Sequence, residues 1–598
     1  MTDKVVKIGG ASGYWGESAM ATPQLLAAGS LDYIVYDYLA EITMSIMARA
    51  KAKDANAGYA TDFISAVLHP HLKEIARQGV KLISNAGGIN PQACGAAARA
   101  LIAEQGLDLK VAIITGDDLL GQQDVIAARA PTEMFTGDNL PQTDKVASIN
   151  AYLGAFPIAK ALGAGADIVI TGRCVDSAVT LGALIHEFGW KEDEWNHLAS
   201  GSLAGHILEC GPQATGGNFT DWEETGDLAN IGYPIGEVKS DGSFIVTKPE
   251  GTGGLVNVGT VSEQMLYEIG DPQAYILPDV ICDLSNVKIT QAGTNRVLVS
   301  PAKGLPAPET YKTCLTYMDG FRAGMLLSFY GMDADKKAEK FADAVFERTR
   351  KTFRQFNAGD FTETSVELLG SQTQFGDFAN TIEAREVVLK IAAKHPDAMG
   401  AGLLLKEIAG LGLATPPGLS GFSGGRPKPS RIVRLFSYLT PKDDIKINID
   451  VDGNTQSMRD RTGTLSDTAT ITRPPAPPAN DDASIEVPLI KLAWGRSGDK
   501  GNKANIGVIA REAKYLPYIW AALDEESVTK RFVHFIRGNP SVQRFLLPGS
   551  NAINFLIDDV LGGGGVASLR NDPQGKGYGQ ILLACPIVVP HDIAESLS

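Results

Sequence analysis

The chain has 598 residues, of which 44% are hydrophobic and 21% charged, a composition typical of a folded globular protein with several domains. Its 54 Lys and Arg against 69 Asp and Glu give a formal net charge of −15, which disfavours a nucleic-acid-binding protein. The six cysteines form no CxxC pair, so we expect neither a zinc ribbon nor a disulfide framework. Without a secretory signal or a long apolar run, we expect a cytoplasmic protein with no membrane partner.

The first part of the chain repeats a plan of strand, glycine-rich loop and helix. Apolar runs without polar alternation predict strands buried on both faces: "KVVKIGG", "LDYIVYDYL", "VKLIS", "LKVAIIT" and "ADIVIT". Their alternation with helices predicts an α/β layer over residues 1–225, with a doubly wound and largely parallel sheet. Ligands of such sheets bind at the carboxyl ends of the strands, so we expect the site in the loops that follow them.

The pattern changes after residue 225. Segments such as "GEVKSDGSFIVTK" predict antiparallel strands, and residues 333–356 predict an amphipathic helix, so we expect an α+β region over 226–471. The proline-rich segment 472–484 is expected to be a linker. Residues 485–598 then predict a separate α+β domain of ferredoxin-like type, in which two strands flank the loop "GRSGDKGNKAN" and "GQILLACPIVV" forms the last strand.

The first glycine loop, "GGASGYWGES", does not have the spacing of a dinucleotide-binding site. Gly10, Gly13 and Gly16 lie three residues apart, and the bulky Tyr14 and Trp15 stand where a pyrophosphate would approach the backbone. The chain also has no GxxxxGK[ST] motif, which excludes a P-loop nucleotide site. We therefore expect no nucleotide cofactor.

The loop "SNAGGINPQACG" combines polar residues with the start of a helix. Asn90 is expected to cap a helix that begins at Pro91. Free N–H groups around Asn85, Gly87 and Gly88 could then bind an anion or an oxyanion. An ordinary capped helix explains the same residues, and the sequence leaves both interpretations open.

The loop "TGRCVDSA" offers a candidate for anion binding and a candidate base. Arg173 could bind a carboxylate or phosphate through its planar guanidinium. Asp176 could orient that arginine or act as a base if its pKa is raised. The alternative is a structural Arg–Asp pair at the start of a helix.

The stretch "HILECGPQATGGNF" contains the densest group of reactive side chains. His206 and Cys210 are four residues apart, hence on one helix face, which permits a Cys–His nucleophile but also suits a core cysteine. Glu209 lies between them and could move a proton. No further ligands stand at metal spacing, so we place no metal site. The polar end of the stretch could bind an anionic ligand through Gln213, Thr215, Gly216, Gly217 and Asn218.

Three further glycine-rich loops, "KPEGTGG", "GLSGFSGGRPKPSR" and "WGRSGDKGNKAN", carry basic residues in an otherwise acidic chain. A local positive site suggests an anionic small ligand, including a phosphate-bearing coenzyme A thioester, although a solvated hairpin loop is the plain alternative. The candidate binding residues of these loops are Lys248, Gly253, Gly254, Arg426, Arg496, Asp499, Lys500 and Asn502.

Taken together, "KIGGASGYWGES", "SNAGGINPQACG", "TGRCVDSA", "ECGPQATGGNF" and "KPEGTGG" resemble the acyclic terpene utilization AtuA family. "AWGRSGDKGNKANIGVIA" is similar to the AtuA-like ferredoxin-fold domain, which is fused here and separate in some members. The resemblance implies a role in the breakdown of citronellol, geraniol and related branched acids through coenzyme A thioesters. It does not imply which reaction the protein carries out.

Three functions stay open at this point. The first is a lyase or hydratase acting on a branched acid or its acyl-CoA, in which Asp176, Glu209, Cys210 or His206 moves the proton and Arg173 with the 85–90 loop binds anionic oxygen. The second is a hydrolase of a thioester or amide with Cys210 as nucleophile. The third is a non-catalytic accessory subunit, whose C-terminal domain would serve for docking. We expect an anionic small-molecule substrate and a homo-oligomer.

Overall fold

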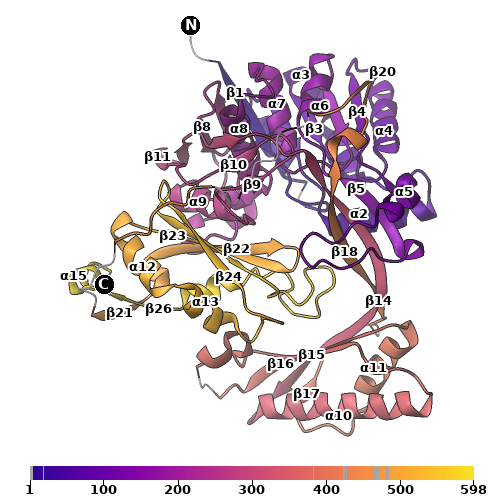
Figure 1. Ribbon diagram of the computed structural model, residues 1–598, viewed down its shortest axis with the longest axis vertical. Helices are drawn as coiled ribbons and strands as arrows, with labels where there is room; N and C mark the ends of the chain where they lie inside the picture. The colour runs from indigo at the N-terminus through magenta and orange to yellow at the C-terminus, as the bar shows by residue number, and fades with distance from the viewer. Residues whose placement is uncertain are drawn as a thin grey trace.

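The computed structural model describes residues 4–597 with the exception of 18, 381–382, 422–424, 426, 462, 464–467, 469–470 and 479–483. Figure 1 shows a large α/β body, a C-terminal domain beside it, and a smaller lobe that two long strands connect to the main body. The predicted mixed α/β class is thereby confirmed.

One mixed sheet forms the centre of the main body. Its strand order is β11-β12-β8-β7-β1-β2-β3-β6-β4-β19-β20, and the stretch from β1 to β4 is parallel. The parallel strands are β1 (Val5–Gly10), β2 (Tyr33–Tyr36), β3 (Lys81–Ser84), β6 (Ile168–Thr171) and β4 (Val111–Thr115). The antiparallel strands are β7 (Ile235–Lys239), β8 (Phe244–Thr247), β12 (Arg296–Val299), β11 (Ile289–Gly293), β19 (Ile447–Val451) and β20 (Asn454–Met458). Strands from both sides of residue 225 therefore share one sheet.

Helices cover both faces of this sheet, as the apolar strands predict. Ile34 and Val35 of β2 point to opposite faces, and each is buried in a different hydrophobic cluster. One face is covered by α6 (Phe156–Gly163), α7 (Ala178–Phe188) and α8 (Trp195–Leu208). The other is covered by α1 (Ala21–Ala28), α2 (Glu41–Lys53), α3 (His69–Gln78) and α4 (Pro91–Glu104). The doubly wound arrangement follows from this burial on both sides.

The smaller lobe is built on the second half of the 21-residue strand β14 (Thr310–Tyr330). The first half of β14 pairs with β5 (Val146–Ala151) and β18 (Ser430–Pro441). The second half pairs with β16 (Glu386–His395) and β17 (Leu419–Ser420), and β16 pairs with β15 (Glu363–Leu369). Two helices, α10 (Ala334–Gln355) and α11 (Ala398–Gly410), pack on this sheet, and α10 is the amphipathic helix that the sequence predicts.

The C-terminal domain is a four-stranded antiparallel sheet with helices on one face. Its strand order is β22 (Ala493–Lys500), β23 (Lys503–Ala510), β25 (Ala552–Ile557) and β24 (Val542–Leu547). The helices are α12 (Leu516–Ala522), α13 (Glu525–Phe532), α14 (Tyr578–Leu583) and α15 (His591–Ser596), and β21 (Ile485–Pro488) pairs with β26 (Pro586–Val589).

Two local predictions in this domain are wrong. The expected loop at 495–505 is mostly strand, because β22 and β23 run on to a turn at Gly501 and Asn502. The expected last strand at 579–589 begins as α14 and becomes β26 only at Pro586. A short buried apolar run fits either a helix or a strand, and periodicity alone cannot distinguish the two.

The remaining elements connect these parts. They are α5 (Gln123–Arg129), α9 (Val258–Leu266), β9 (Tyr275–Ile276), β10 (Ile281–Asp283) and β13 (Lys303–Leu305). The segment that follows α9 packs against the C-terminal sheet, because two buried asparagines of that sheet donate hydrogen bonds to its carbonyl oxygens.

Candidate functional site

Polar residues gather at the carboxyl ends of the parallel strands, as expected for this kind of sheet. Asp37 follows β2 directly, Asn85 follows β3, Asp117 lies two residues beyond β4, and Arg173 lies two residues beyond β6. All four are at most 5% exposed. The topology thus brings together loops that are far apart in the sequence.

Arg173 lies at the centre of this group. Its Nη1 donates hydrogen bonds to the carbonyl oxygens of Leu39 (2.9 Å) and Cys174 (3.2 Å) and to Oδ1 of Asp176 (2.8 Å). Its guanidinium lies 4.1 Å from the centre of the Tyr152 ring, and its buried Nε has no hydrogen-bond partner among the described residues. Burial alone would lower the pKa of Arg173, but the surrounding acidic groups raise it. The Arg173–Asp176 pair, which the sequence leaves open as an alternative, is present, and Nε is a buried donor without a partner among the described residues.

Asp37 is an acidic group that the sequence analysis missed. Asn85 donates to its Oδ1 (2.5 Å) through Nδ2, while Oδ1 of Asn85 accepts the N–H of Tyr38 (2.8 Å). Burial raises the pKa of Asp37, and the charges of Asp176 and Glu209 raise it further. Asn85 therefore orients a carboxyl group whose pKa burial raises. The available signal was an acid at the end of the apolar run "LDYIVYDYL".

Three backbone donors of the 85–90 loop are occupied inside the fold. The N–H groups of Gly88, Ile89 and Asn90 donate to backbone carbonyl oxygens. Asn90 accepts the N–H of Ala93 (3.4 Å) and so caps α4, while a Cβ on Gly87 would lie 2.5 Å from a backbone oxygen. Of the two interpretations left open by the sequence, the capped helix matches these contacts.

Glu41 and Lys312 extend the cluster toward the strand β14. The hydroxyl of Tyr152 donates to Oε1 of Glu41 (2.6 Å), and Nζ of Lys312 lies 3.4 Å from the same oxygen. Burial would raise the pKa of Glu41, but Lys312 and Arg173 together hold it well below its usual value. These residues lie outside every sequence motif, because only the tertiary fold brings them to the site.

His206 pairs with Glu209 and not with Cys210. His206 lies in the last turn of α8, where its Nδ1 is 2.9 Å from Oε1 of Glu209 and its Nε2 is 3.2 Å from the carbonyl oxygen of Met265. Burial would lower the pKa of His206, but the charge of Glu209 raises it. Burial in turn raises the pKa of Glu209. The helical spacing was predicted, but the partner was not.

Cys210 follows this pair in a strongly acidic environment. Burial raises the pKa of its thiol well above the usual value, and the charges of Glu209, Glu268 and Asp37 add to the effect. The first glycine loop packs directly on it, since a Cβ on Gly13 would lie 2.9 Å from Cα of Cys210. The thiol is therefore held in its protonated form.

The two glycine loops at 213–218 and 248–254 pack on each other. Oγ1 of Thr215 donates to the carbonyl oxygen of Gly232 (2.5 Å), and Gly217 N donates to a carbonyl oxygen (2.8 Å). A Cβ on Gly254 would lie 2.4 Å from the carbonyl oxygen of Thr215, and Nζ of Lys248 donates to that of Thr252 (2.6 Å). These contacts occupy several polar groups of the two loops inside the fold. The close approach also explains the glycines at 216 and 254, which have φ of 104° and 82°.

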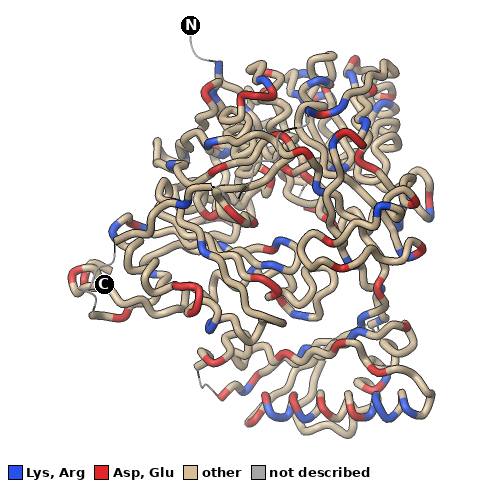
Figure 2. Tube along the Cα trace, in the orientation of Figure 1, with Lys and Arg blue, Asp and Glu red and all other residues tan. Residues whose placement is uncertain are grey.

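The C-terminal domain contributes charged side chains to the same cluster. Nζ of Lys500, at the end of β22, lies 3.6 Å from Oε2 of Glu268, and Nζ of Lys576 lies 3.3 Å from Oε1. Burial would lower the pKa of Lys500, but Glu268, Asp176 and Glu209 raise it. Burial and the charge of Glu268 raise the pKa of Asp499 to about 6. Figure 2 shows acidic and basic segments where the two domains face each other.

Solvent reaches these facing groups. The side chains of Lys500, Asp176 and Glu268 keep 40%, 35% and 28% exposure. By contrast, Asn502 is used in the turn, where its Nδ2 donates to Oδ1 of Asp559 (2.6 Å). The candidate site is thus composite: Asp37, Arg173, Asp176, His206, Glu209 and Glu268 come from the main body, and Asp499 and Lys500 from the C-terminal domain.

The remaining candidate residues make other contacts, and one of them lies outside the described residues. Nη1 of Arg496 donates to the carbonyl oxygen of Asn218 (2.8 Å), which links the two domains. Gly253 donates its N–H to the carbonyl oxygen of Asn230 (2.8 Å), and Gln213 has a buried Oε1 with no partner among the described residues. Arg426 lies outside the described residues.

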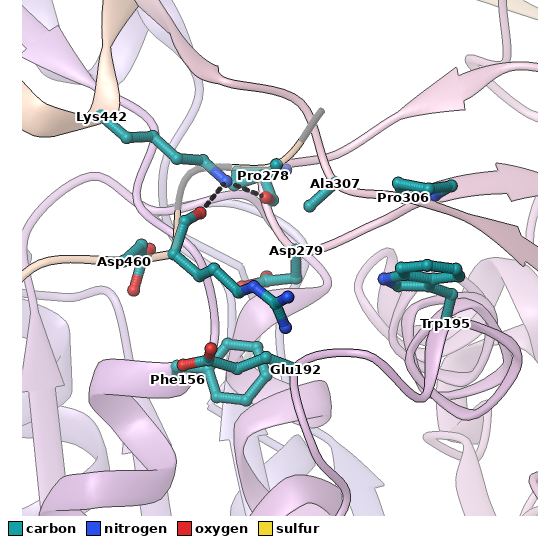
Figure 3. Close-up of a pocket in the computed structure, with 11 residues that line it drawn as sticks. Phe156, Glu192, Trp195, Pro278, Asp279, Pro306, Ala307, Lys442 and Asp460 are labelled. Carbon is teal, nitrogen blue, oxygen red and sulfur yellow. Dashed lines mark hydrogen bonds between the residues drawn. The ribbon is translucent and has the colours of Figure 1, made fainter. Parts of the chain in front are cut away.

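A separate pocket of about 100 Å³ lies between α6, α8 and the end of β18 (Figure 3). Two of its lining acids interact: burial and the charge of Asp460 raise the pKa of Asp279 to about 7. Nζ of Lys442 donates to the carbonyl oxygen of Pro278 (2.7 Å), and Tyr311 donates to Oδ2 of Asp460 (2.5 Å). None of the sequence-predicted site residues lines this pocket.

Neither a metal-binding cluster nor a membrane-spanning helix is found among the described residues. No group of three His, Cys, Asp or Glu side chains there is arranged to hold a metal ion. None of their helices is both long enough and apolar enough to cross a membrane.

Comparison with known proteins bears on both parts of the chain. No curated protein and no solved structure matches it. Residues 487–588 match the AtuA ferredoxin-like domain, which confirms the resemblance of the C-terminal part. Residues 6–451 match the model of the acyclic terpene utilisation family protein AtuA. The chain therefore belongs to the acyclic terpene utilisation AtuA family, with the AtuA ferredoxin-like domain fused behind the main domain.

Proposed function

We propose that the protein is a catabolic enzyme of acyclic terpene utilisation that acts by acid–base chemistry on a branched acid or its coenzyme A thioester, as a lyase or hydratase. The family supports the pathway class. The observation that carries the reaction class is the buried His206–Glu209 pair, which faces the ammonium group of Lys500 from the C-terminal domain.

The hydrogen bonds of His206 define where its protons lie. The carbonyl oxygen of Met265 can only accept, so Nε2 of His206 carries a hydrogen. The short contact between Nδ1 and Glu209 then needs one further proton, which either group can hold. A pair that holds one exchangeable proton can give it to a substrate or take one from it, as a lyase or hydratase requires.

The neighbouring groups supply the other needs of such chemistry. The ammonium of Lys500 can stabilise negative charge that develops on a carbonyl or carboxylate oxygen of the substrate. The Nε–H of Arg173 is a buried donor without a protein partner, which a bound oxygen could satisfy. Asp37, whose pKa is raised by burial, is a second candidate acid in the same cluster.

The two alternatives have less support. A nucleophilic cysteine needs a lowered pKa and a base within reach of its sulfur, whereas the pKa of Cys210 is raised and His206 pairs with Glu209. A purely docking role for the C-terminal domain does not account for Lys500, which faces Asp176 and Glu209. Cys210→Ala should accordingly leave activity intact. In a cysteine hydrolase, the same substitution would abolish activity.

The test is a substrate panel. The purified full chain is incubated with branched acyl-CoA thioesters and the corresponding free acids. Mass spectrometry then detects the gain or loss of water, or carbon–carbon cleavage, and thermal shift reports binding. Glu209→Gln should lower turnover by roughly 10²-fold or more, the typical contribution of a general acid or base.

The chain provides a matched control on the same helix. Glu194 lies three residues before His197 at the exposed start of α8, with the same spacing as the buried pair. Glu194→Gln should leave turnover unchanged. If neither turnover nor a thermal shift occurs with any member of the panel, the proposal fails.

A further inference from the structure

Glu268 has a backbone conformation that is unusual for its residue type. Its φ is +58°, in the left-handed region that residues other than Gly and Asn rarely adopt. Residues held in this region tend to lie at functional sites, where the surrounding structure enforces the conformation. Glu268 belongs to the main body, two residues after the end of α9. Tyr267 beside it interacts with its carboxylate, and both lysines that pair with the carboxylate belong to the C-terminal domain.

Two fully buried asparagines of the C-terminal sheet enforce this conformation. Oδ1 of Asn505 accepts the N–H of Glu268 (2.9 Å), and its Nδ2 donates to the carbonyl oxygen of Leu266 (2.7 Å). Nδ2 of Asn554 donates to the carbonyl oxygens of Ile269 (2.9 Å) and Gly270 (2.7 Å). The two asparagines also bond to each other, since Nδ2 of Asn505 donates to Oδ1 of Asn554 (3.0 Å).

The result is a clamp on the backbone at 266–270. Because both polar atoms of the Asn505 amide are used, its orientation is fixed, and with it the direction of the Glu268 N–H. The carboxylate of Glu268 then lies between the ammonium groups of Lys500 and Lys576. The charged and titratable groups that interact with Lys500 include Glu268, Tyr275, Asp176, Glu209, His206 and Asp499.

We infer that Glu268 is a positioning residue: it holds Lys500 of the C-terminal domain toward Asp176 and Glu209, and the Asn505–Asn554 clamp holds Glu268. The inference deepens the proposed function, on which it rests for the role of the site. Docking of the C-terminal domain and completion of the site are then one event, because the clamp and Lys500 lie on adjoining strands, β22, β23 and β25.

The test reads Lys500 directly and needs no substrate. Lysine side chains of the full chain are reductively methylated with ¹³C, and the Lys500 resonance is assigned by its loss in Lys500→Arg. In the unsubstituted protein it should titrate above the ordinary lysine value of about 10.4. In Glu268→Gln the midpoint should fall by about one unit or more, because the nearest negative charge is gone.

The clamp has its own variant. Asn505→Ala leaves the Lys500 side chain itself unchanged. It removes the hydrogen bond that holds the backbone of Glu268, so the titration midpoint of Lys500 should shift in the same direction as in Glu268→Gln. Glu268→Gly removes the same charge without backbone strain, so it keeps the experiment interpretable if Asn505→Ala fails to fold. It should lower the midpoint while keeping the melting temperature of the unsubstituted protein.

The control is an equivalent ion pair on the neighbouring strand. Nζ of Lys503 lies 2.9 Å from Oδ1 of Asp558, and Asp558→Asn should move the Lys503 resonance but not that of Lys500. An unchanged Lys500 midpoint in Glu268→Gln would overturn the inference, whatever the substrate panel shows. A shift in Glu268→Gln without one in a folded Asn505→Ala would overturn the role of the clamp.

Discussion

Nδ1 of His206 lies 2.9 Å from Oε1 of Glu209, and the histidine ring is sealed from solvent at 2% exposure. The same helix carries a second His–Glu pair of equal spacing at its other end, where Nδ1 of His197 lies 3.5 Å from Oε1 of Glu194 and the side chains are 35% and 38% exposed. Identical local sequence spacing thus gives one buried pair and one solvated pair. Burial strengthens the electrostatic interaction within the His206–Glu209 pair, whereas water screens the more exposed pair.

This contrast predicts a titration difference. Burial lowers the pKa of His206, and Glu209→Gln removes the charge that does most to raise it. The His206 midpoint should therefore fall by about one unit or more, measured by NMR of the imidazole resonances. Glu194→Gln should leave the His206 midpoint where it is. A His206 midpoint that stays the same in Glu209→Gln would mean that the two groups do not share a proton.

The contacts of Arg173 predict that its substitution lowers the free energy of unfolding. A lysine in its place has the same charge but lacks the planar fork that reaches Leu39, Cys174 and Asp176 at once, and it stacks less well on Tyr152. Arg173→Lys should lower the free energy of unfolding by roughly 2–4 kcal/mol, measured by urea denaturation, since it leaves buried acceptors and acids poorly paired. Arg434→Lys is the control, because that arginine is 45% exposed beside Asp319 and should change little. Equal losses in the two variants would contradict the central role of Arg173.

The sequence could predict which edge of the sheet carries the candidate site, but it could not predict all the residues of that site. Strand-ending loops carry Asn85, Arg173 and Asp176, and the rule that ligands bind at carboxyl ends of parallel strands placed them together. Glu41, Lys312 and Glu268 lie in no loop of that edge. They reach the cluster from a helix start, a long strand and an interdomain segment, and no local pattern contains that information.

The glycine-rich loops at 213–218 and 248–254 show a different difficulty. Their glycine and polar residues predict ligand binding, and the structure shows in addition that they pack two loops together. Composition cannot separate these cases, because a glycine that admits a ligand and one that admits another backbone look the same in sequence. The C-terminal loop did contribute Lys500, although as the end of a strand.

The raised pKa of Asp117 predicts how the free energy of unfolding depends on pH. Burial raises its pKa to about 7 in the folded chain, against about 3.9 in the unfolded one. The folded state thus binds more protons between these values, so the stability contributed by this group is full below pH 4 and is lost as the pH rises through 7. Asp117→Asn should abolish this loss of stability. Between pH 5 and 7 the free energy of unfolding should then fall by on the order of 2 kcal/mol less than in the unsubstituted protein.

The control for Asp117 is its exposed neighbour. Asp118→Asn removes an exposed charge that makes only a minor contribution to the raised pKa of Asp117, so it should change the slope of stability against pH much less than Asp117→Asn does. Denaturant titrations at several pH values measure both variants. If Asp117→Asn retains the full slope between pH 5 and 7, the pKa of the buried carboxyl is not raised as proposed.

The contacts of Gly13 predict that the first glycine loop fixes the position of the His206–Glu209 pair. A Cβ at this position would lie 2.9 Å from Cα of Cys210 and 3.1 Å from the carbonyl oxygen of Glu209, and neither backbone atom can rotate away. Gly13→Ala should therefore cost about 1–3 kcal/mol of folding free energy and move the NMR titration of His206, because the turn that carries Glu209 must shift. Gly121→Ala is the matched control, since a Cβ there meets nothing within 4 Å. If Gly13→Ala is as stable as that control and His206 titrates as before, the first glycine loop plays no part in holding the pair.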